Sequence, residues 1–374
     1  MRRYLLNSTY SILFFLVLVL FPSQNTRAGG GGDGEFNAGH LIIDHVIDSH
    51  EWHIISIGEK HISVPLPIII LEDGKITAFM SSRFEHGHAA YKNYELHTSG
   101  KHKGKIVKVN NDGTVDENAK IYDFSITKNT LALFISVFLI SILFIRISRR
   151  YQKNPLSSPK GIQSLIEPLI LFVRDDIAKS SIGPKYERYL PFLLTMFFFI
   201  LINNLIGLIP IFPGGANLTG NITVCMILAL FTFLVTTFTG NKNYWAHIFN
   251  TPGVPWWLKV PMPLMPIIEI LGALTKPFVL MVRLFANITA GHIIALGFIS
   301  LILIFGQISA AAAYGISIIS VLLYVFIGML ELLVAFLQAY VFTLLSALYF
   351  GMAVEEHHHE HEHDHVHEHA HENH

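Results

Sequence analysis

Two long stretches of this chain contain no charged residue, and they constrain its fold more than any other feature. No Asp, Glu, Lys or Arg occurs from Leu284 to Leu330 or from Tyr189 to Gly240. About 20 consecutive apolar residues are enough for a helix to span a bilayer. The whole chain is 52% hydrophobic and only 14% charged, whereas a soluble domain has about 25% charged residues. The sequence therefore predicts a mainly α-helical polytopic membrane protein.

The charge and cysteine content exclude several other classes. A formal net charge of −1 gives no sign of a nucleic-acid partner. The only cysteine, Cys225, lies in an apolar run, so an intrachain disulfide and a cysteine-built metal site are excluded. Histidine is unusually frequent, with 21 residues that gather mainly before position 103 and after position 356.

The N-terminus predicts export of the segment that follows it. Residues 1–28 resemble a secretory signal, in which Arg2 and Arg3 precede an apolar core and Ala28 ends a cleavage site. An uncleaved membrane anchor is the alternative. In both cases residue 29 onward begins outside the cytoplasm.

The next hundred residues predict a small extracytoplasmic α+β domain, over 29–125. Its glycine-rich start (29–34) indicates a flexible joint, and residues 40–53 indicate a short helix. Two β-rich runs around Asp73-Gly74, within 67–79, predict a hairpin. The domain's nine histidines are potential metal ligands, but their scattered spacing favours a solvated surface.

A membrane domain is predicted over 126–354, followed by a His/Glu-rich disordered tail over 355–374. Basic residues that follow the first span place its end in the cytoplasm. A separate helix before the second span is expected to lie on the membrane surface, and a Trp-rich belt follows the third span. These segments are the spans 130–145, 191–209 and 222–239, the surface helix 162–180 and the belt 242–259.

Two further apolar stretches, 263–306 and 314–352, are too long to cross a bilayer upright. An unbroken helix of either length measures roughly 60 Å against a hydrocarbon core of about 30 Å. A break at Pro277 or Gly291 would leave an ordinary span and a stub. A strongly inclined helical hairpin is the other interpretation, and the lengths favour it. The expected total is five transmembrane helices, the last two long and inclined.

These two stretches contain four charged residues, and three of them are spaced by seven. Glu269, Lys276 and Arg283 share one stripe of a helix, because seven residues return to within about 20° of the starting direction. Asn287 lies one turn beyond Arg283 on the same face, and His292 lies on roughly the opposite face. In the second stretch Glu331 and Gln338 again share a face.

A charge at mid-membrane costs about 2.5 to 3.5 kcal/mol even on the lenient insertion scale. A structural salt bridge between Arg283 and Glu331 is one explanation, but charges on two faces with a histidine among them favour an ion path. Arginine does not release its proton, so Arg283 suits a fixed barrier. His292 and Glu331 exchange protons readily and suit a transfer station, and Glu269 suits a second entrance. Two half-channels that do not connect directly are the predicted arrangement.

Two motifs carry a specific resemblance. The runs "KPFVLMVRLFANITAGH" and "ELLVAFLQAYVFTLLSALYFGMAVEEH" resemble subunit a of the rotary ATP synthase, the proton-channel stator of its membrane sector. The resemblance covers about 125–357 and includes the "NNLIGLIP" and "GNIT" segments. It implies partners outside this chain: a ring of c subunits, each with one membrane carboxylate, and the b subunits of the peripheral stalk.

The resemblance also implies roles for individual residues. Arg283 would keep a passing c-subunit carboxylate charged and block protons that cross without rotation. Asn287 and Gln338 match positions that line or support this site, and Glu269 and Lys276 match the cytoplasmic side of the pathway.

Two departures from the family pattern are informative. The family often has glutamate at the position of His292 and histidine at that of Glu331, so the pair is exchanged here with both chemical groups kept. A carboxylate that some members carry on the second span is replaced by Gly207. Asparagines and threonines near that span are then candidates for the outer lining, namely Asn203, Asn204, Asn217, Thr219 and Asn221.

The sequence thus predicts a non-catalytic subunit, because no phosphate-binding glycine loop precedes a basic residue and ATP chemistry is expected in other chains. No cofactor and no metal site are predicted. The expected location is the bacterial inner membrane, with the N-terminal domain outside and the C-terminus in the cytoplasm. A zinc-type metal-cation transporter with histidine-rich ends is the alternative, although His292 is the only histidine within a predicted span. Loose metal binding by the tail and coupling to sodium instead of protons both stay open.

Overall fold

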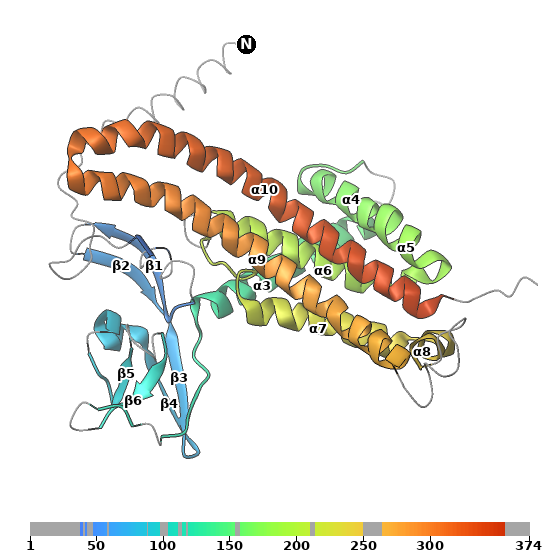
Figure 1. The fold of residues 1–374 in the computed structure, drawn as a ribbon, viewed down its shortest axis with the longest axis horizontal. Coiled ribbons are helices and arrows are strands. Elements are labelled where there is room, and N and C mark those ends of the chain that lie inside the picture. The colour runs from blue at the N-terminus through green and yellow to red at the C-terminus, as the bar shows by residue number, and fades with distance from the viewer. Residues whose placement is uncertain are drawn as a thin grey trace, which may run out of the picture. The chain divides into compact units, whose positions relative to one another are not determined.

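A computed structural model gives the fold (Figure 1). It describes residues 38–39, 42, 48–57, 60–87, 89–97, 104–110, 114–116, 119–153, 158–209, 214–249 and 264–355. The predicted signal segment, the glycine joint and nearly all of the tail lie outside these residues. The chain divides into two units, the first comprising 1–131 and 295–325, the second 132–294 and 326–374.

The first unit contains the strands. They form a β1-β2 pair, a three-stranded sheet in the order β4-β3-β7, and a β5-β6 pair, all antiparallel. Their bounds are β1 Glu51–Ile57, β2 Lys60–Pro65, β3 Pro67–Glu72, β4 Lys75–Met80, β5 Tyr94–Leu96, β6 Ile106–Lys108 and β7 Ile121–Asp123. A 3-10 helix, η1 (Ser81–Gly87), follows β4.

The predicted hairpin is confirmed as β3 and β4. Asp73 and Gly74, between the strands, have φ angles of 45° and 77°, and two left-handed residues match the twist of the paired strands. The helix predicted over 40–53 is wrong at its end, because residues 51–53 belong to β1 and pair with β2. Most of 40–47 lies outside the described residues. The β-branched residues of "EWHIISI" find a partner strand that a local helical pattern does not reveal.

A small core and one polar cluster hold these strands together. Ile68, Ile70 and Phe84 are fully buried. The Glu72 carboxylate accepts hydrogen bonds of 2.6 Å from Lys108 Nζ and 2.6 Å from Tyr94 Oη. These bonds lower the pKa of Glu72. Burial, together with the bond to Glu72, raises the pKa of Tyr94 to about 12.

Five helical segments in the described part of the chain are long and apolar enough to cross a membrane, as predicted. They are α3 (Lys128–Lys153), the composite segment Ile162–Leu208, α7 (Ile222–Thr239), α9 (Leu264–Ile308) and α10 (Ala310–Val354). The chain is a multi-pass membrane protein.

The composite segment contains the predicted surface helix and the second span. Gly183, with φ of 74°, ends the first helical run, and α6 begins three residues later. The parts are α4 (Ile162–Phe172), a π-helical turn η3 (Val173–Lys179), α5 (Ser180–Ile182), a 3-10 turn η4 (Gly183–Lys185) and α6 (Tyr186–Leu208).

Side chains cap the helices that follow. Asn221 Oδ1 accepts the Thr223 amide at the start of α7, and Asn241 Oδ1 accepts the Tyr244 amide in α8 (Lys242–Phe249). The remainder of the predicted Trp-rich belt lies outside the described residues.

The last two helices are continuous, each with 45 residues. The break considered at Pro277 or Gly291 is therefore wrong. Neighbouring helices can compensate for the hydrogen bond that a proline removes within a membrane. A single residue, Ser309, joins α9 to α10, and its Oγ accepts the Ala312 amide. The inclination of this hairpin in the bilayer stays a prediction.

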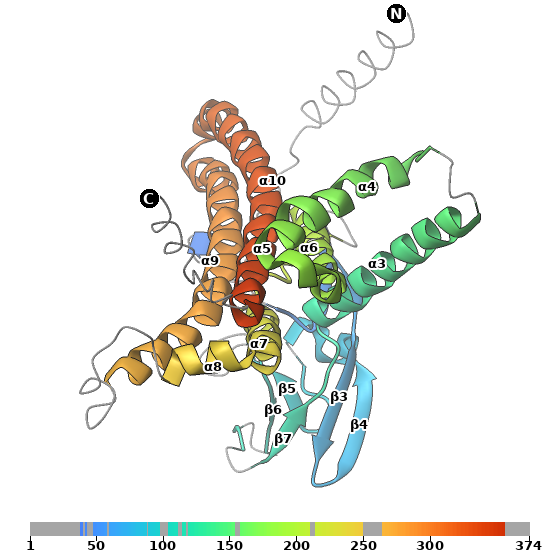
Figure 2. The ribbon, with the colours of Figure 1, turned by 90° about the vertical axis from the view of Figure 1, so that its right-hand side faces the viewer.

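Packing in the second unit positions the polar residues of α9 and α10. Figures 1 and 2 show these two helices side by side. Small residues of α10, Ala339 and Ala347, are fully buried, as are Leu193 and Phe197 of α6. Close packing at small residues is how membrane helices associate, and it leaves the opposite side of the hairpin exposed.

Candidate proton-transfer site

The α9–α10 hairpin brings His292 and Glu331 into contact. His292 Nδ1 lies 3.1 Å from Glu331 Oε1, and the two side chains are 17% and 14% exposed. Both groups gain and lose protons, and a hydrogen bond of this length lets one pass directly between them. The geometry of the pair therefore permits the proton-transfer role predicted for it.

Two glycines make room for this pair. A Cβ atom at Gly291 would lie 2.5 Å from Glu331 Oε1, so a side chain there would displace the carboxylate. A Cβ atom at Gly207 of α6 would lie 3.8 Å from His292 Nε2 and 3.4 Å from the Ala216 carbonyl oxygen. One imidazole nitrogen therefore faces Glu331, and the other faces the position where some family members carry a carboxylate.

Arg283 is arranged differently. Its side chain is exposed, and it forms no ion pair or hydrogen bond with any residue that the structure describes. Glu331 instead bonds His292, so the alternative of a structural Arg283–Glu331 salt bridge does not hold. Asn287, one turn further along α9, is also exposed. Apolar neighbours of Arg283 such as Val279 and Val282 are exposed as well.

A buried polar network supports α10 beside the site. Asn204 of α6 donates to the Ala335 carbonyl oxygen at 3.1 Å and accepts from Thr219 Oγ1 at 2.6 Å. Gln338 is 7% exposed, seven residues beyond Glu331. Asn203 differs from Asn204, because its amide donates to Phe199 within its own helix.

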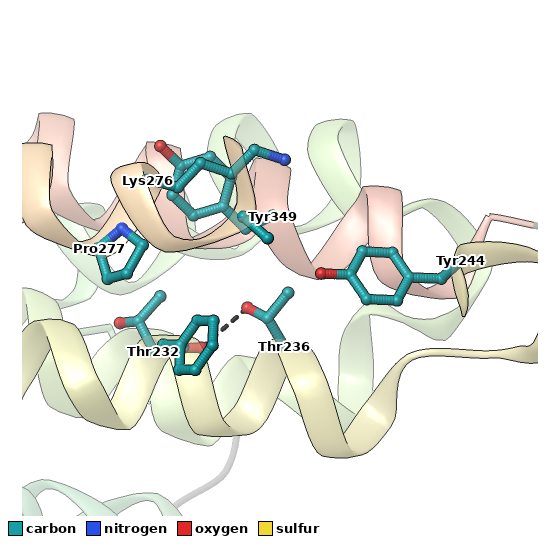
Figure 3. Close-up of a pocket in the computed structure, with 8 residues that line it drawn as sticks. Thr232, Thr236, Tyr244, Lys276, Pro277 and Tyr349 are labelled. Atoms are coloured by element: carbon teal, nitrogen blue, oxygen red, sulfur yellow. Dashed lines mark hydrogen bonds between the residues drawn. The ribbon is translucent and has the colours of Figure 1, made fainter. Parts of the chain in front are cut away.

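A second polar group surrounds Lys276 (Figure 3). Lys276 Nζ lies 5.4 Å from the centre of the Tyr349 ring, a cation–π geometry. Half-buried Glu269 lies seven residues earlier on α9. Lys276 lies in a pocket whose lining comes from α7, α8, α9 and α10. The lining residues are Thr232, Phe233, Thr236, Tyr244, Ala273, Lys276, Pro277 and Tyr349.

The hydroxyl groups of this pocket were not predicted from the sequence. Thr232 and Thr236 lie one turn apart on the apolar helix α7. This spacing in the sequence indicates that two hydroxyl groups share one face of the helix. No group of three or more His, Cys, Asp or Glu residues that could hold a metal ion occurs within the described ranges. The His-rich tail falls outside them.

Comparisons with known proteins agree with the resemblance. A family model described as "ATP synthase A chain" matches residues 130–351. A second model, a domain of unknown function (DUF8433), matches residues 41–124.

Three relatives illustrate the similarity. The chain is 44% identical over 245 residues to ATP synthase subunit a of Chloroherpeton thalassium, covering 64% of this chain and 69% of that protein. It is 35% identical over 331 residues to ATP synthase subunit a of Chlorobium phaeobacteroides, covering 86% and 78%. It is 43% identical over 244 residues to ATP synthase subunit a of Myxococcus xanthus, covering 63% and 75%.

The family model covers more than half of the chain, and the five apolar helices fit a membrane subunit. This family supports the role of a proton-channel stator, a part of the membrane sector without a catalytic site. The chain belongs to the ATP synthase subunit a family.

Proposed function

We propose that this chain conducts protons through two offset half-channels to and from the carboxylates of a c-ring, and that Arg283 blocks direct leak between them. Proton flow is thereby coupled to rotation and ATP synthesis. The observation that carries the proposal is the exposed residue Arg283, whose guanidinium has no acidic partner among the described residues.

The physical argument begins with the cost of that cation. A charge at mid-membrane costs about 2.5 to 3.5 kcal/mol at the least, and an anionic partner offsets this cost. Since the described part of the chain supplies no such partner, we infer that another chain supplies it. A c-subunit carboxylate that passes Arg283 would be held in its ionised form until it moves on.

The two half-channels correspond to polar groups on either side of Arg283 along α9. The His292–Glu331 pair lies on one side, and the Lys276 pocket with Glu269 lies on the other. At 1.5 Å per residue, His292 is about 13 Å and Lys276 about 10 Å from Arg283 along the axis. Asn287 and Gln338 would support the central site. This separation suits two half-channels that each lead to the rotor but do not connect directly with each other.

The complex and its location belong to the same proposal. The partners are the c-ring, the b subunits of the peripheral stalk and the lipid bilayer of a bacterial inner membrane. The N-terminal strand-containing domain lies outside the cytoplasm, and the C-terminus lies in the cytoplasm.

The test replaces Arg283 with alanine in the assembled complex. Inverted vesicles with a pH-sensitive dye should show no ATP-driven acidification, although the subunits are present at normal levels. Arg149→Ala, an exposed arginine near the end of α3, is the matched control and should pump normally. Normal pumping by the Arg283→Ala complex would refute the mechanism. Zinc transport that survives this substitution would favour the metal-transporter alternative.

A further inference from the structure

The β4-β3-β7 sheet of the first unit carries apolar residues on both faces. One face, with Ile68 and Ile70, packs into the small core. We call the other face the open sheet face. Its side chains alternate with the core residues, and it consists of Pro67, Ile69, Leu71, Ile76, Ala78, Met80, Tyr122 and the adjoining Phe124.

The β4 and β7 side of the open sheet face is exposed, its β3 residues are half-buried, and none of its residues is charged. Ile76 is 72%, Tyr122 60% and Phe124 63% exposed. An antiparallel sheet with one buried face normally carries polar residues on the other. Here the charged residues of the three strands, such as Glu72 and Asp123, share the core-side direction with Ile70. A contiguous exposed apolar surface of this kind marks an interaction site.

Hydrogen bonds hold this sheet beside the start of the first membrane helix. The Phe124 amide donates to the Ile69 carbonyl and the Ile126 amide to the Pro67 carbonyl, both at 2.9 Å. Only two residues later α3 begins, a distance of about 7 Å at most. A second link runs from the Asn129 amide to Asp48 Oδ1 at 3.0 Å. The sheet is therefore hydrogen-bonded to the residues that lead directly into α3.

We propose that the open sheet face rests on the lipid bilayer. The face is continuous with a membrane span, and its most exposed residues include a tyrosine and a phenylalanine. A tyrosine ring has one polar end and favours the headgroup region. A phenylalanine ring is apolar throughout and favours the acyl-chain side of the boundary. Aliphatic side chains such as Ile76 and Met80 would enter the boundary by a few ångströms, as in amphipathic elements that lie on membranes.

Site-specific fluorescence quenching tests this contact in the full chain. Because Cys225 is the only cysteine, Cys225→Ser gives a background for Ile76→Cys and Phe124→Cys, each labelled with a polarity-sensitive fluorophore in phosphatidylcholine vesicles. A spin-labelled phospholipid should quench both probes severalfold more than a probe at Lys75→Cys, an exposed position on the opposite face. Aqueous iodide should show the reverse order.

Two results would overturn the proposal. Equal quenching at Ile76 and Lys75 would show that the face is in water. Protection of the Ile76 and Phe124 probes from both quenchers would show that a protein covers it.

If labelling at Ile76 disturbs the sheet, a variant with charges on the open sheet face provides a second test, read from the Phe124 probe alone. Ile76→Glu combined with Tyr122→Glu should release the Phe124 probe to iodide by disfavouring lipid contact. Thr77→Glu, on the core-side face, is the control and should leave lipid quenching of that probe in place. Lipid quenching that persists in the double variant would contradict the proposal.

Discussion

His292 of α9 and Glu331 of α10, thirty-nine residues apart in the chain, face each other with Nδ1 3.1 Å from Oε1. Their chemical identities are exchanged relative to the pattern often found in the family, yet the two groups still meet. Arg283, on the same helix as His292, makes no such contact within the described residues. In the hairpin, the protonatable groups of His292 and Glu331 therefore contact each other. The permanent cation of Arg283 remains available to a partner.

Exchanging the pair tests whether the two residues cooperate. His292→Glu combined with Glu331→His keeps one carboxylate and one imidazole at the contact, so it should retain more proton pumping than the worse single variant. ATP-driven acidification of inverted vesicles, normalised to the amount of assembled complex, is the measurement. A double variant that pumps less than both single variants would show that the residues do not act together.

Gly291 is predicted to be important for pumping because a side chain there would displace the Glu331 carboxylate. The Cβ of Gly291→Ala would lie 2.5 Å from Oε1, and misplacing a reacting group by about 1 Å can slow a reaction by up to about 100-fold. We expect pumping to fall at least about tenfold.

Gly297→Ala is the matched control for this substitution. It lies on the same helix, and its Cβ would meet no atom within 4 Å. Alanine there should leave pumping unchanged and stabilise the helix slightly. Equal pumping by the two variants would remove the steric argument.

Much of the fold was predictable because its signals are local. Uncharged runs locate the membrane helices, and Asp73-Gly74 locates the β3–β4 turn. Strand β1 was missed because its partner β2, not its own residues, decides its conformation. The continuity of α9 through Pro277 depends on the helices packed around it, which a local rule for proline does not include.

The site was predictable only in part for a similar reason. Charged residues in apolar helices stand out, so Arg283, Lys276 and Glu331 were found from the sequence. The pocket near Lys276 joins hydroxyl groups from three other helices, among them Thr232, Tyr244 and Tyr349. Such residues occur at many places in membrane helices, and only the three-dimensional packing shows which of them meet.

Asn204 is predicted to stabilise the second unit by linking α6 to α10 and to the segment before α7. Replacing it with leucine leaves the Thr219 hydroxyl and the Ala335 carbonyl without this partner, at a cost of about 1 to 3 kcal/mol. The apparent melting temperature of the detergent-solubilised chain should fall.

Asn203→Leu is the control for Asn204→Leu. Asn203 is equally buried, but its amide bonds a carbonyl of its own helix, so its loss should lower the melting temperature less. A larger effect at Asn203 would contradict the role of the Asn204 network.

Tyr94 is predicted to make the strand-containing unit sensitive to alkali. Burial and the bond to Glu72 raise its pKa from 10.0 to about 12, so the folded state keeps the phenolic proton after the unfolded state has lost it. Stability is therefore unaffected below pH 10 and falls as the pH rises from 10 towards 12, by about 3 kcal/mol at most. Tyr94→Phe should reduce this slope, although it also loses the bond to Glu72 and is less stable at neutral pH. A smaller slope remains because the bond to Glu72 also raises the pKa of Lys108.

The fluorescence of buried Trp52, with Trp245, Trp256 and Trp257 replaced by phenylalanine, reports unfolding of this unit. Denaturant midpoints measured between pH 8 and 12 give the slope. Tyr122→Phe, at a tyrosine that is 60% exposed, is the control and should keep it. The decisive comparison is the difference in slope and not in absolute stability, because only the slope reports the titration of Tyr94. If Tyr94→Phe and the parent lose stability in parallel, another group titrates and the assignment to Tyr94 is wrong.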